Sequence, residues 1–214
     1  MKKIFLTMAL LACTAGIMTV SAQKKVALKV STVAQGAESK TVNVTKDKKG
    51  YITLFDGKNL DGWRGYGKDH VPARWTVEDG CLKFNAGQGE GGDIIFAHKF
   101  KNFILEMEWK VSKGANSGIF YLAQEVKNDK GGMEPIFISA PECQVLDNEN
   151  HPDAKLGVDG NRKASSLYDM IPAKPQNAKP YGEWNQVAIV VNNGTVTHFM
   201  NGAKVVTYKL WTPE

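Results

Sequence analysis

The sequence predicts an all-β domain, a sandwich or a barrel, that begins near Tyr51 and runs to Glu214. Two observations carry this prediction. Short runs that alternate apolar and polar residues, of which Phe103–Val111 is the clearest, are spaced along this part of the chain. Asp-Gly and Asn-Gly pairs, which favour tight hairpins, separate several of these runs. No helical pattern longer than two turns interrupts them.

The predicted strands follow one another at short intervals. Asp79-Gly80 joins the first pair into a hairpin, and Asn193-Gly194 and Asn201-Gly202 join the last three into a meander. Alternation along Phe103–Val111 places Leu105, Met107 and Trp109 on the core side, together with Ile189 and Val191. The predicted strands are Trp75–Val77, Cys81–Phe84, Phe103–Val111, Gly118–Ala123, Glu142–Leu146, Gln186–Val191, Thr195–Met200 and Ala203–Leu210.

The first 50 residues are predicted to lie outside this domain. Residues 1–22 combine a basic start, an uncharged apolar run and the ending Val20-Ser21-Ala22, a pattern typical of an export signal cleaved after Ala22. A transmembrane anchor and lipid modification of Cys13 are the alternatives, and the short run that continues past Cys13 favours the cleaved signal. We therefore expect a mature chain in the periplasm or cell envelope, without a transmembrane span. Residues 23–50 are predicted to be a flexible basic leader, with an edge strand along the alternating residues Val26–Val30 as the alternative.

Charge is distributed unevenly along the chain. Residues 1–50 hold nine Lys against two acidic residues, whereas the remainder holds 18 Lys and Arg against 20 Asp and Glu. The slightly acidic body argues against a nucleic-acid groove, which needs clustered basic side chains on the folded domain. Once the signal is removed, Cys81 and Cys143 are the cysteines left, and we expect two free or buried thiols.

Two acidic side chains on one predicted strand are a first candidate for chemistry. Glu106 and Glu108 lie two residues apart, so they face the same way at a separation of about 6.5–7 Å from the strand rise. Inverting glycosidases hold their two carboxylates at a similar separation. A solvated sheet face with alternating charge has the same pattern.

The segment Glu142–Asp153 is the densest polar cluster. Glu142 and Gln144 share one strand face, and an oxygen-rich loop follows them. Asp147, His151 and Asp153 in this loop are candidate ligands for a divalent cation, which prefers oxygen donors. An Asx-rich turn that binds no metal has the same composition.

Single imidazole and indole groups are weaker candidates. His198 alternates with Val196 and Met200, so we expect it to be partly buried and hydrogen-bonded more often than catalytic. Trp184 lies beside a loop and is a candidate for stacking on a sugar ring, although core packing is favoured for a tryptophan.

Six segments in chain order resemble the 3-keto-disaccharide hydrolase domain family, formerly known as a domain of unknown function. Each piece alone is weak, but their order makes the resemblance specific, and it covers roughly Ile52 to the end. The segments are Leu54–Trp63, Asn116–Tyr121, Glu142–Asn148 with His151–Asp153, Leu167–Asp169, Gly182–Asn185 and Asn201-Gly202.

The resemblance implies a concanavalin-like jelly roll, a two-sheet antiparallel sandwich whose concave sheet binds sugar. The sequence departs from the family pattern at two places. Cys143 stands where an aromatic residue is common, and the chain stops at Glu214 where members usually continue through a Gly-rich segment and a closing strand. We therefore expect a C-terminally incomplete sandwich.

The resemblance also implies an activity: cleavage of glycosides already oxidised at carbon 3 of the sugar, such as 3-keto-disaccharides. A separate sugar oxidoreductase makes the ketone, so no nicotinamide or flavin is expected here, and a divalent cation is the one candidate cofactor. A non-catalytic carbohydrate-binding module and an ordinary glycosidase using Glu106 and Glu108 are the alternatives, since fold does not fix function.

The predicted active centre lies on the Glu142 strand, which the resemblance identifies as the acidic strand of the family. Glu142 is the first candidate for proton transfer, with His198 and Asp147 in reserve. Lys110 is a candidate to stabilise an enolate oxygen, and Glu108 is expected on the same face. The remaining predicted substrate contacts are Gln144, Tyr121, Tyr168 and Trp184.

Overall fold

The structure is a computed structural model that describes residues 2–5, 24–35, 37–87 and 89–213. Within these residues it is all β, as predicted, with two 3₁₀ turns and no α-helix. The elements are β1 (Lys2–Phe5), β2 (Lys24–Ser31), β3 (Ser39–Lys46), β4 (Tyr51–Thr53), β5 (Trp63–Gly65), β6 (Trp75–Glu78), β7 (Cys81–Phe84), β8 (Ile94–Phe96), β9 (Phe103–Trp109), β10 (Asn116–Phe120), η1 (Ile136–Ile138), β11 (Glu142–Leu146), η2 (Pro152–Lys155), β12 (Asn185–Asn192), β13 (Thr195–Met200) and β14 (Ala203–Lys209).

The chain divides into two compact units, Lys2–Lys99 and Phe100–Glu214. The domain predicted from Tyr51 onward has residues in both units, and its bounds stay a prediction. We describe each unit by itself, and every residue predicted to act in the active centre belongs to the second.

The N-terminal unit corrects one prediction from the sequence. The predicted flexible leader, residues 23–50, contains β2 and β3, which pair along their whole length as an antiparallel hairpin. Alternation explains the difference: Leu28 and Val30 on β2 and Val42 and Val44 on β3 are buried, while their neighbours are largely exposed. Short β-branched runs with period two thus bury enough apolar surface to order a segment that composition alone suggests is disordered.

The predicted export signal lies mostly outside the described residues. Its described part is the backbone of β1, which pairs in parallel with β4. Cleavage after Ala22 stays a prediction, and it would remove β1 from this sheet. No helix in the described ranges is both long and apolar enough to cross a membrane.

Asp-Gly and Asn-Gly pairs form the turns expected of them. Asp79 and Gly80 both have positive φ and join β6 to β7 with Glu78 opposite Cys81. Asn193-Gly194 joins β12 to β13 and Asn201-Gly202 joins β13 to β14, again with positive φ at all four residues. This is the backbone of type I′ hairpins, which match the twist of the flanking strands.

The C-terminal unit contains a four-stranded antiparallel sheet in the order β14-β13-β12-β9. Its register places Leu105 opposite Ile189 and Ile189 opposite His198, so these side chains share one face. That face is the core side, because Ile189 and Val191 are buried. Trp109 is buried there too, as predicted, whereas Leu105 and Met107 are only half-buried.

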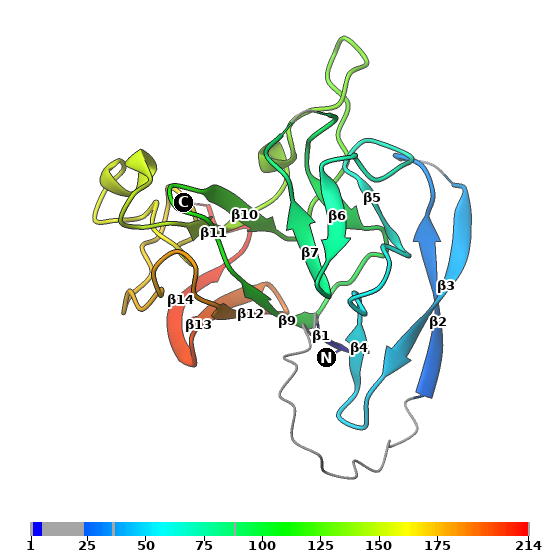
Figure 1. Cartoon of the computed structure of the whole chain (residues 1–214), viewed down its shortest axis with the longest axis horizontal. Helices are drawn as coiled ribbons and strands as arrows, with labels where there is room; N and C mark the ends of the chain where they lie inside the picture. Colours follow the sequence, from blue (N-terminus) through cyan, green and yellow to red (C-terminus); the bar gives the residue numbers. More distant parts are fainter. Residues whose placement is uncertain (1, 6–23, 36, 88, 214) are drawn as a thin grey trace. The chain divides into compact units, whose positions relative to one another are not determined.

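A second sheet in this unit pairs β10 with β11. Cys143 on β11 also forms an antiparallel bridge with Leu167, which brings the segment 166–168 alongside the other edge of β11. The ring of Tyr121, at the end of β10, meets His198 of the first sheet. The two sheets therefore face each other across a shared interior, with β10 and β11 drawn in green and β12 to β14 in orange to red (Figure 1). This is the predicted two-sheet antiparallel sandwich.

Candidate active site

The two faces of β11 have different surroundings. We call the face that carries Cys143 and Val145 the inner face, because Cys143 points toward Ser165 in the interior. Alternation puts Glu142, Gln144 and Leu146 on the opposite, outer face. Glu142 is half-buried, whereas Gln144 and Leu146 are each 1 % exposed. Glu142 is thus the accessible end of the outer row.

Two neighbours surround Glu142 on the outer face. Across β10 its side chain lies over Gly118, so closely that a methyl group on Gly118 would collide with it. On the other side, the amide of Tyr168 donates to the carbonyl of Glu142 at 3.0 Å. The bridge between Cys143 and Leu167 makes Tyr168 the residue opposite Glu142, so both side chains face outward.

An ionic cluster fixes the Tyr168 phenol. Tyr168 Oη donates to Asp153 Oδ2 at 3.0 Å, and Arg162 Nη1 donates to Asp153 Oδ1 at 3.0 Å. Arg162 also holds both carboxylate oxygens of Asp169, at 2.7 and 3.0 Å. Its guanidinium carbon lies 5.5 Å from the centre of the Tyr168 ring. Burial raises the pKa of Tyr168, and the hydrogen bond to Asp153 raises it further, so the phenol stays protonated.

Gln144 is directed into its own strand. Its Oε1 accepts a hydrogen bond from the amide of Val145 at 2.9 Å. The backbone of Gln144 also pairs with Ser165 and Ser166. This side chain therefore stabilises the local backbone, and its burial argues against the predicted contact with sugar hydroxyls.

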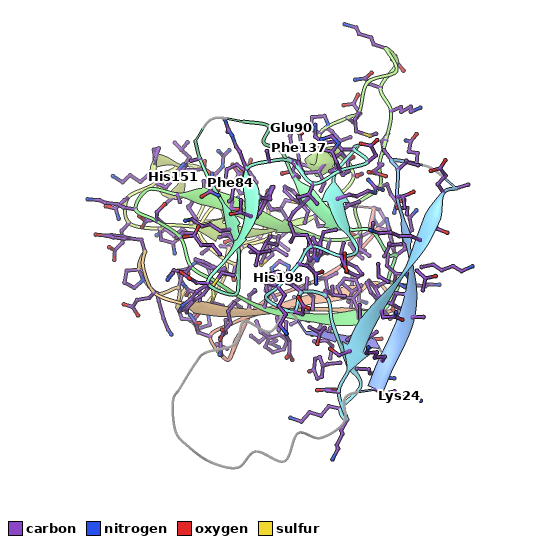
Figure 2. The ribbon with its side chains drawn as sticks, turned by 45° about the vertical axis from the view of Figure 1, so that its right-hand side comes forward. Lys24, Phe84, Glu90, Phe137, His151 and His198 are labelled. Carbon is purple, nitrogen blue, oxygen red and sulfur yellow. The ribbon has the colours of Figure 1, made fainter. Side chains whose placement is uncertain are left out.

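A row of hydrogen bonds crosses the interior beside the inner face of β11. His198 is 0 % exposed, and its Nδ1 lies 2.9 Å from the carbonyl of Ser165, so Nδ1 carries the proton and donates. Nε2 then accepts from Tyr121 Oη at 2.8 Å, and Tyr121 accepts in turn from Tyr208 Oη at 2.6 Å. Burial lowers the pKa of His198 to about 4. Figure 2 shows His198 surrounded by other side chains.

These hydrogen bonds occupy both ring nitrogens of His198, the predicted reserve base. Tyr121, predicted as a ring contact for sugar, is 4 % exposed and belongs to the same row of hydrogen bonds. The geometry of both residues favours a structural role. Burial also raises the pKa of Cys143 to about 12, so its thiol is protonated and unreactive. Cys81 and Cys143 are both free thiols, as expected.

Asp147 caps the turn that follows β11. Its Oδ2 accepts from the amide of Gly114 at 2.7 Å and from Asn150 Nδ2 at 2.8 Å, and its Oδ1 accepts from the amides of Glu149 and Asn150. Burial raises the pKa of Asp147, but these four hydrogen bonds together outweigh it and hold the pKa below its ordinary value. A carboxylate held in this way is a structural cap.

The predicted metal site does not form. His151 Nδ1 accepts from the amide of Asp153 at 3.1 Å and caps η2, while Asp153 faces Arg162 and Tyr168. Across the residues that the structure describes, no three His, Cys, Asp or Glu side chains are grouped so that they could hold a metal ion. The three predicted ligands do not fit a divalent cation, because the oxygen-rich loop uses its acceptors on nearby amides and on Arg162.

Glu108 and Lys110 do not share the outer face of β11, contrary to expectation. They alternate with Trp109, so they lie on the side of the β9 sheet that turns away from the interior. Glu108 accepts from Gln186 Nε2 at 2.9 Å, and Lys110 Nζ lies 4.7 Å from the centre of the Trp184 ring. Glu142 occupies the outer side of the other sheet. The two groups therefore lie on opposite sides of the sandwich.

Arg162 is a cation on the Tyr168 side of Glu142, and sequence reasoning missed it. No local motif marks it, because its partners Asp153 and Asp169 come from the turn η2 and from the chain after residue 168. Ser165 was missed for a similar reason: its carbonyl orients His198, and it has positive φ without being glycine or asparagine.

Comparison with known proteins shows which family the chain resembles. Residues 50–214 match the family described as 3-keto-alpha-glucoside-1,2-lyase-like domain. The chain is 57 % identical over 236 residues to a 3-keto-disaccharide hydrolase from Bacteroides thetaiotaomicron, covering 100 % of this chain and 81 % of that protein.

Two solved structures from Parabacteroides distasonis, both assigned as glycosyl hydrolases, have a similar fold. The first has a TM-score of 0.63 and 27 % identity, and the match covers 75 % of this chain and 72 % of that one. The second has a TM-score of 0.50 and 25 % identity, over 96 % of this chain and 86 % of that one. The protein is thus a glycoside-cleaving hydrolase, and it belongs to the 3-keto-alpha-glucoside-1,2-lyase-like domain family.

Proposed function

We propose that this enzyme cleaves 3-keto-glycosides, 3-keto-disaccharides among them, by removing a proton next to the ketone. The observation that carries the proposal is the position of Glu142, which is half-buried on the outer face of β11, directly opposite Tyr168. The related Bacteroides protein is named for the same substrate class.

The chemistry follows from the ketone. A carbonyl at carbon 3 acidifies the proton on carbon 2, and a base that takes this proton leaves an enolate. The glycosidic oxygen on carbon 1 is then β to the carbonyl, so the C1–O bond breaks as the enolate collapses and a proton passes to the leaving oxygen. Addition of water across the resulting double bond returns a proton to carbon 2 and places a hydroxyl on carbon 1. The net reaction is hydrolysis.

Three groups on the outer face have suitable chemistry. Glu142 is the proposed base, within reach of a sugar that lies across β10 and β11. The ring of Tyr168 is the proposed contact for the sugar. Arg162 is the proposed positive group beside the enolate oxygen, in place of Lys110, because its bonds to Asp153 and Asp169 use three of its five N–H groups and leave two.

Two further parts of the proposal concern the source of the substrate and the location of the enzyme. The ketone has to be made by a separate sugar oxidoreductase, since the reaction proposed here neither oxidises nor reduces the substrate. Export to the periplasm or cell envelope rests on the predicted signal segment alone.

The proposal is tested with a 3-keto-disaccharide and the matching unoxidised disaccharide. We expect the wild-type enzyme to cleave the first and to leave the second intact. Replacing Glu142 with glutamine keeps its shape but removes the base, so cleavage should fall by about 100-fold or more while substrate still binds. Equal cleavage of both sugars would point to an ordinary glycosidase. Undiminished turnover by Glu142→Gln would show that another residue is the base.

A further inference from the structure

Gly118 has a property that its backbone does not explain. Many glycines in this chain have positive φ, where side chains are rarely accommodated, but Gly118 does not. It lies in the middle of β10, paired with Gln144 of β11. Glycine in a strand interior weakens the strand, and it commonly marks a place where another group approaches closely.

That group is the side chain of Glu142. A Cβ atom added at Gly118 would lie 2.6 Å from Glu142 Cδ and 2.8 Å from Glu142 Cγ, and nearer still to Glu142 Oε1. All three atoms are closer than the 3.0 Å that real Cβ contacts almost never fall below. The three nearest atoms to this position all belong to the Glu142 side chain, so a side chain at residue 118 would displace the Glu142 carboxylate.

We propose that Gly118 is a positioning residue for Glu142: the missing side chain leaves a slot on β10 in which the carboxylate lies flat against the strand. The slot limits how far the carboxylate can swing along the face, and so fixes the direction from which it meets a sugar. This inference rests on the proposed function, in which Glu142 is the base.

Gly118→Ala closes the slot with one methyl group. The carboxylate must then leave its place, and a displacement of about 1 Å is enough to lower turnover by about 100-fold. We expect kcat on a 3-keto-disaccharide to fall on this scale while KM changes little, and the pH dependence of kcat to shift because the base has a new environment. Gly87→Ala is the matched control, because a Cβ at Gly87 meets nothing within 4 Å and its φ is not positive. It should keep wild-type kinetics.

Unfolding measurements test the contact between residue 118 and Glu142 independently of the role of Glu142 in catalysis. Gly118→Ala should lower the urea midpoint of unfolding in the wild-type background, and this loss should vanish in a Glu142→Ala background, where the collision is absent. If Gly118→Ala does not fold alone but folds together with Glu142→Ala, the slot is supported. Equal loss in both backgrounds, or failure to fold in both, would overturn it.

The kinetic outcomes are also distinguishable. If Glu142→Gln is impaired and Gly118→Ala retains wild-type kcat and pH profile, the positioning role of Gly118 is wrong and the proposed function stands. If Glu142→Gln turns over normally, another residue is the base, and the positioning role of Gly118 fails, whatever the unfolding measurements show of the contact itself. Cleavage of 3-keto-disaccharides, which the comparison with the unoxidised sugar tests, would then stand without Glu142.

Discussion

The interior beside the inner face of β11 and the outer face of β11 hold similar polar groups in opposite situations. In the interior, His198, Tyr121 and Tyr208 form a row of hydrogen bonds that ends at the carbonyl of Ser165, so the imidazole has both nitrogens occupied. On the outer face, Glu142 lies half-buried at the accessible end of its row, facing Tyr168. Residue type alone ranks His198 as a good base. Burial and two hydrogen-bond partners favour a structural role for His198, and Glu142 stays the proposed base.

The largest expected effect is on the free energy of unfolding, through the pH-dependent contribution of His198 in the interior. Its pKa of about 4 in the folded chain lies below the ordinary value of 6.5. The contribution is therefore complete above about pH 6.5 and is lost as the pH falls toward 4, and it amounts to about 3 kcal/mol at 1.36 kcal/mol per pH unit.

Urea unfolding of wild type and His198→Gln across this pH range measures that contribution. The difference between the two free energies of unfolding should shrink by about 3 kcal/mol as the pH falls. A pH-independent difference would mean that His198 titrates normally, and the inner face would then be open to water.

The two tyrosines of the row of hydrogen bonds should differ in their effect. Tyr121 Oη bonds to the buried His198 and the half-buried Tyr208, so Tyr121→Phe removes two hydrogen bonds and should cost about 2 kcal/mol of unfolding free energy. Tyr208→Phe removes only the hydrogen bond to Tyr121 Oη and should lower the free energy of unfolding by about 1 kcal/mol. Chemical denaturation of both variants gives the values. An increased KM for Tyr121→Phe with unchanged stability would instead support the predicted sugar contact.

The smallest expected effect on turnover is that of replacing Glu108, which lies on the outward side of the β9 sheet. Glu108→Gln changes the same carboxylate chemistry as Glu142→Gln, but Glu108 lies on the side of β9 that faces away from the interior and contacts Gln186. We expect steady-state turnover on a 3-keto-disaccharide to stay at the wild-type level. A large loss would place the chemistry on the β9 sheet and favour the paired carboxylates Glu106 and Glu108.

Local signals predicted most of the fold. The Asn-Gly and Asp-Gly turns, the strand Glu142–Leu146 and the strand Thr195–Met200 each depend on a few neighbouring residues, and the structure confirms them. An edge strand along Val26–Val30 was only the alternative to a flexible leader, because composition was weighted above alternation, and the structure shows the hairpin of β2 and β3.

The candidate site was less predictable because it depends on which sheet faces meet. Alternation correctly put Glu142 and Gln144 on one face, and Glu108 and Lys110 on one face. It does not tell whether those two faces are the same, since that is set by the packing of one sheet on the other. For the same reason Arg162, which joins the Tyr168 side through Asp153 and Asp169, has no signal in the sequence.

The fate of the proton on carbon 2 tests the central claim most directly. A 3-keto-disaccharide that carries deuterium at carbon 2 is cleaved in ordinary water, with short reaction times and an enzyme-free control for spontaneous exchange. We predict that the released 3-keto sugar has lost the deuterium and that the labelled substrate is cleaved more slowly than the unlabelled one. Glu142→Gln should lower the rates of exchange and of cleavage together, by about 100-fold or more. Cleavage that retains deuterium at carbon 2 would contradict proton abstraction by Glu142 and would show direct displacement at carbon 1.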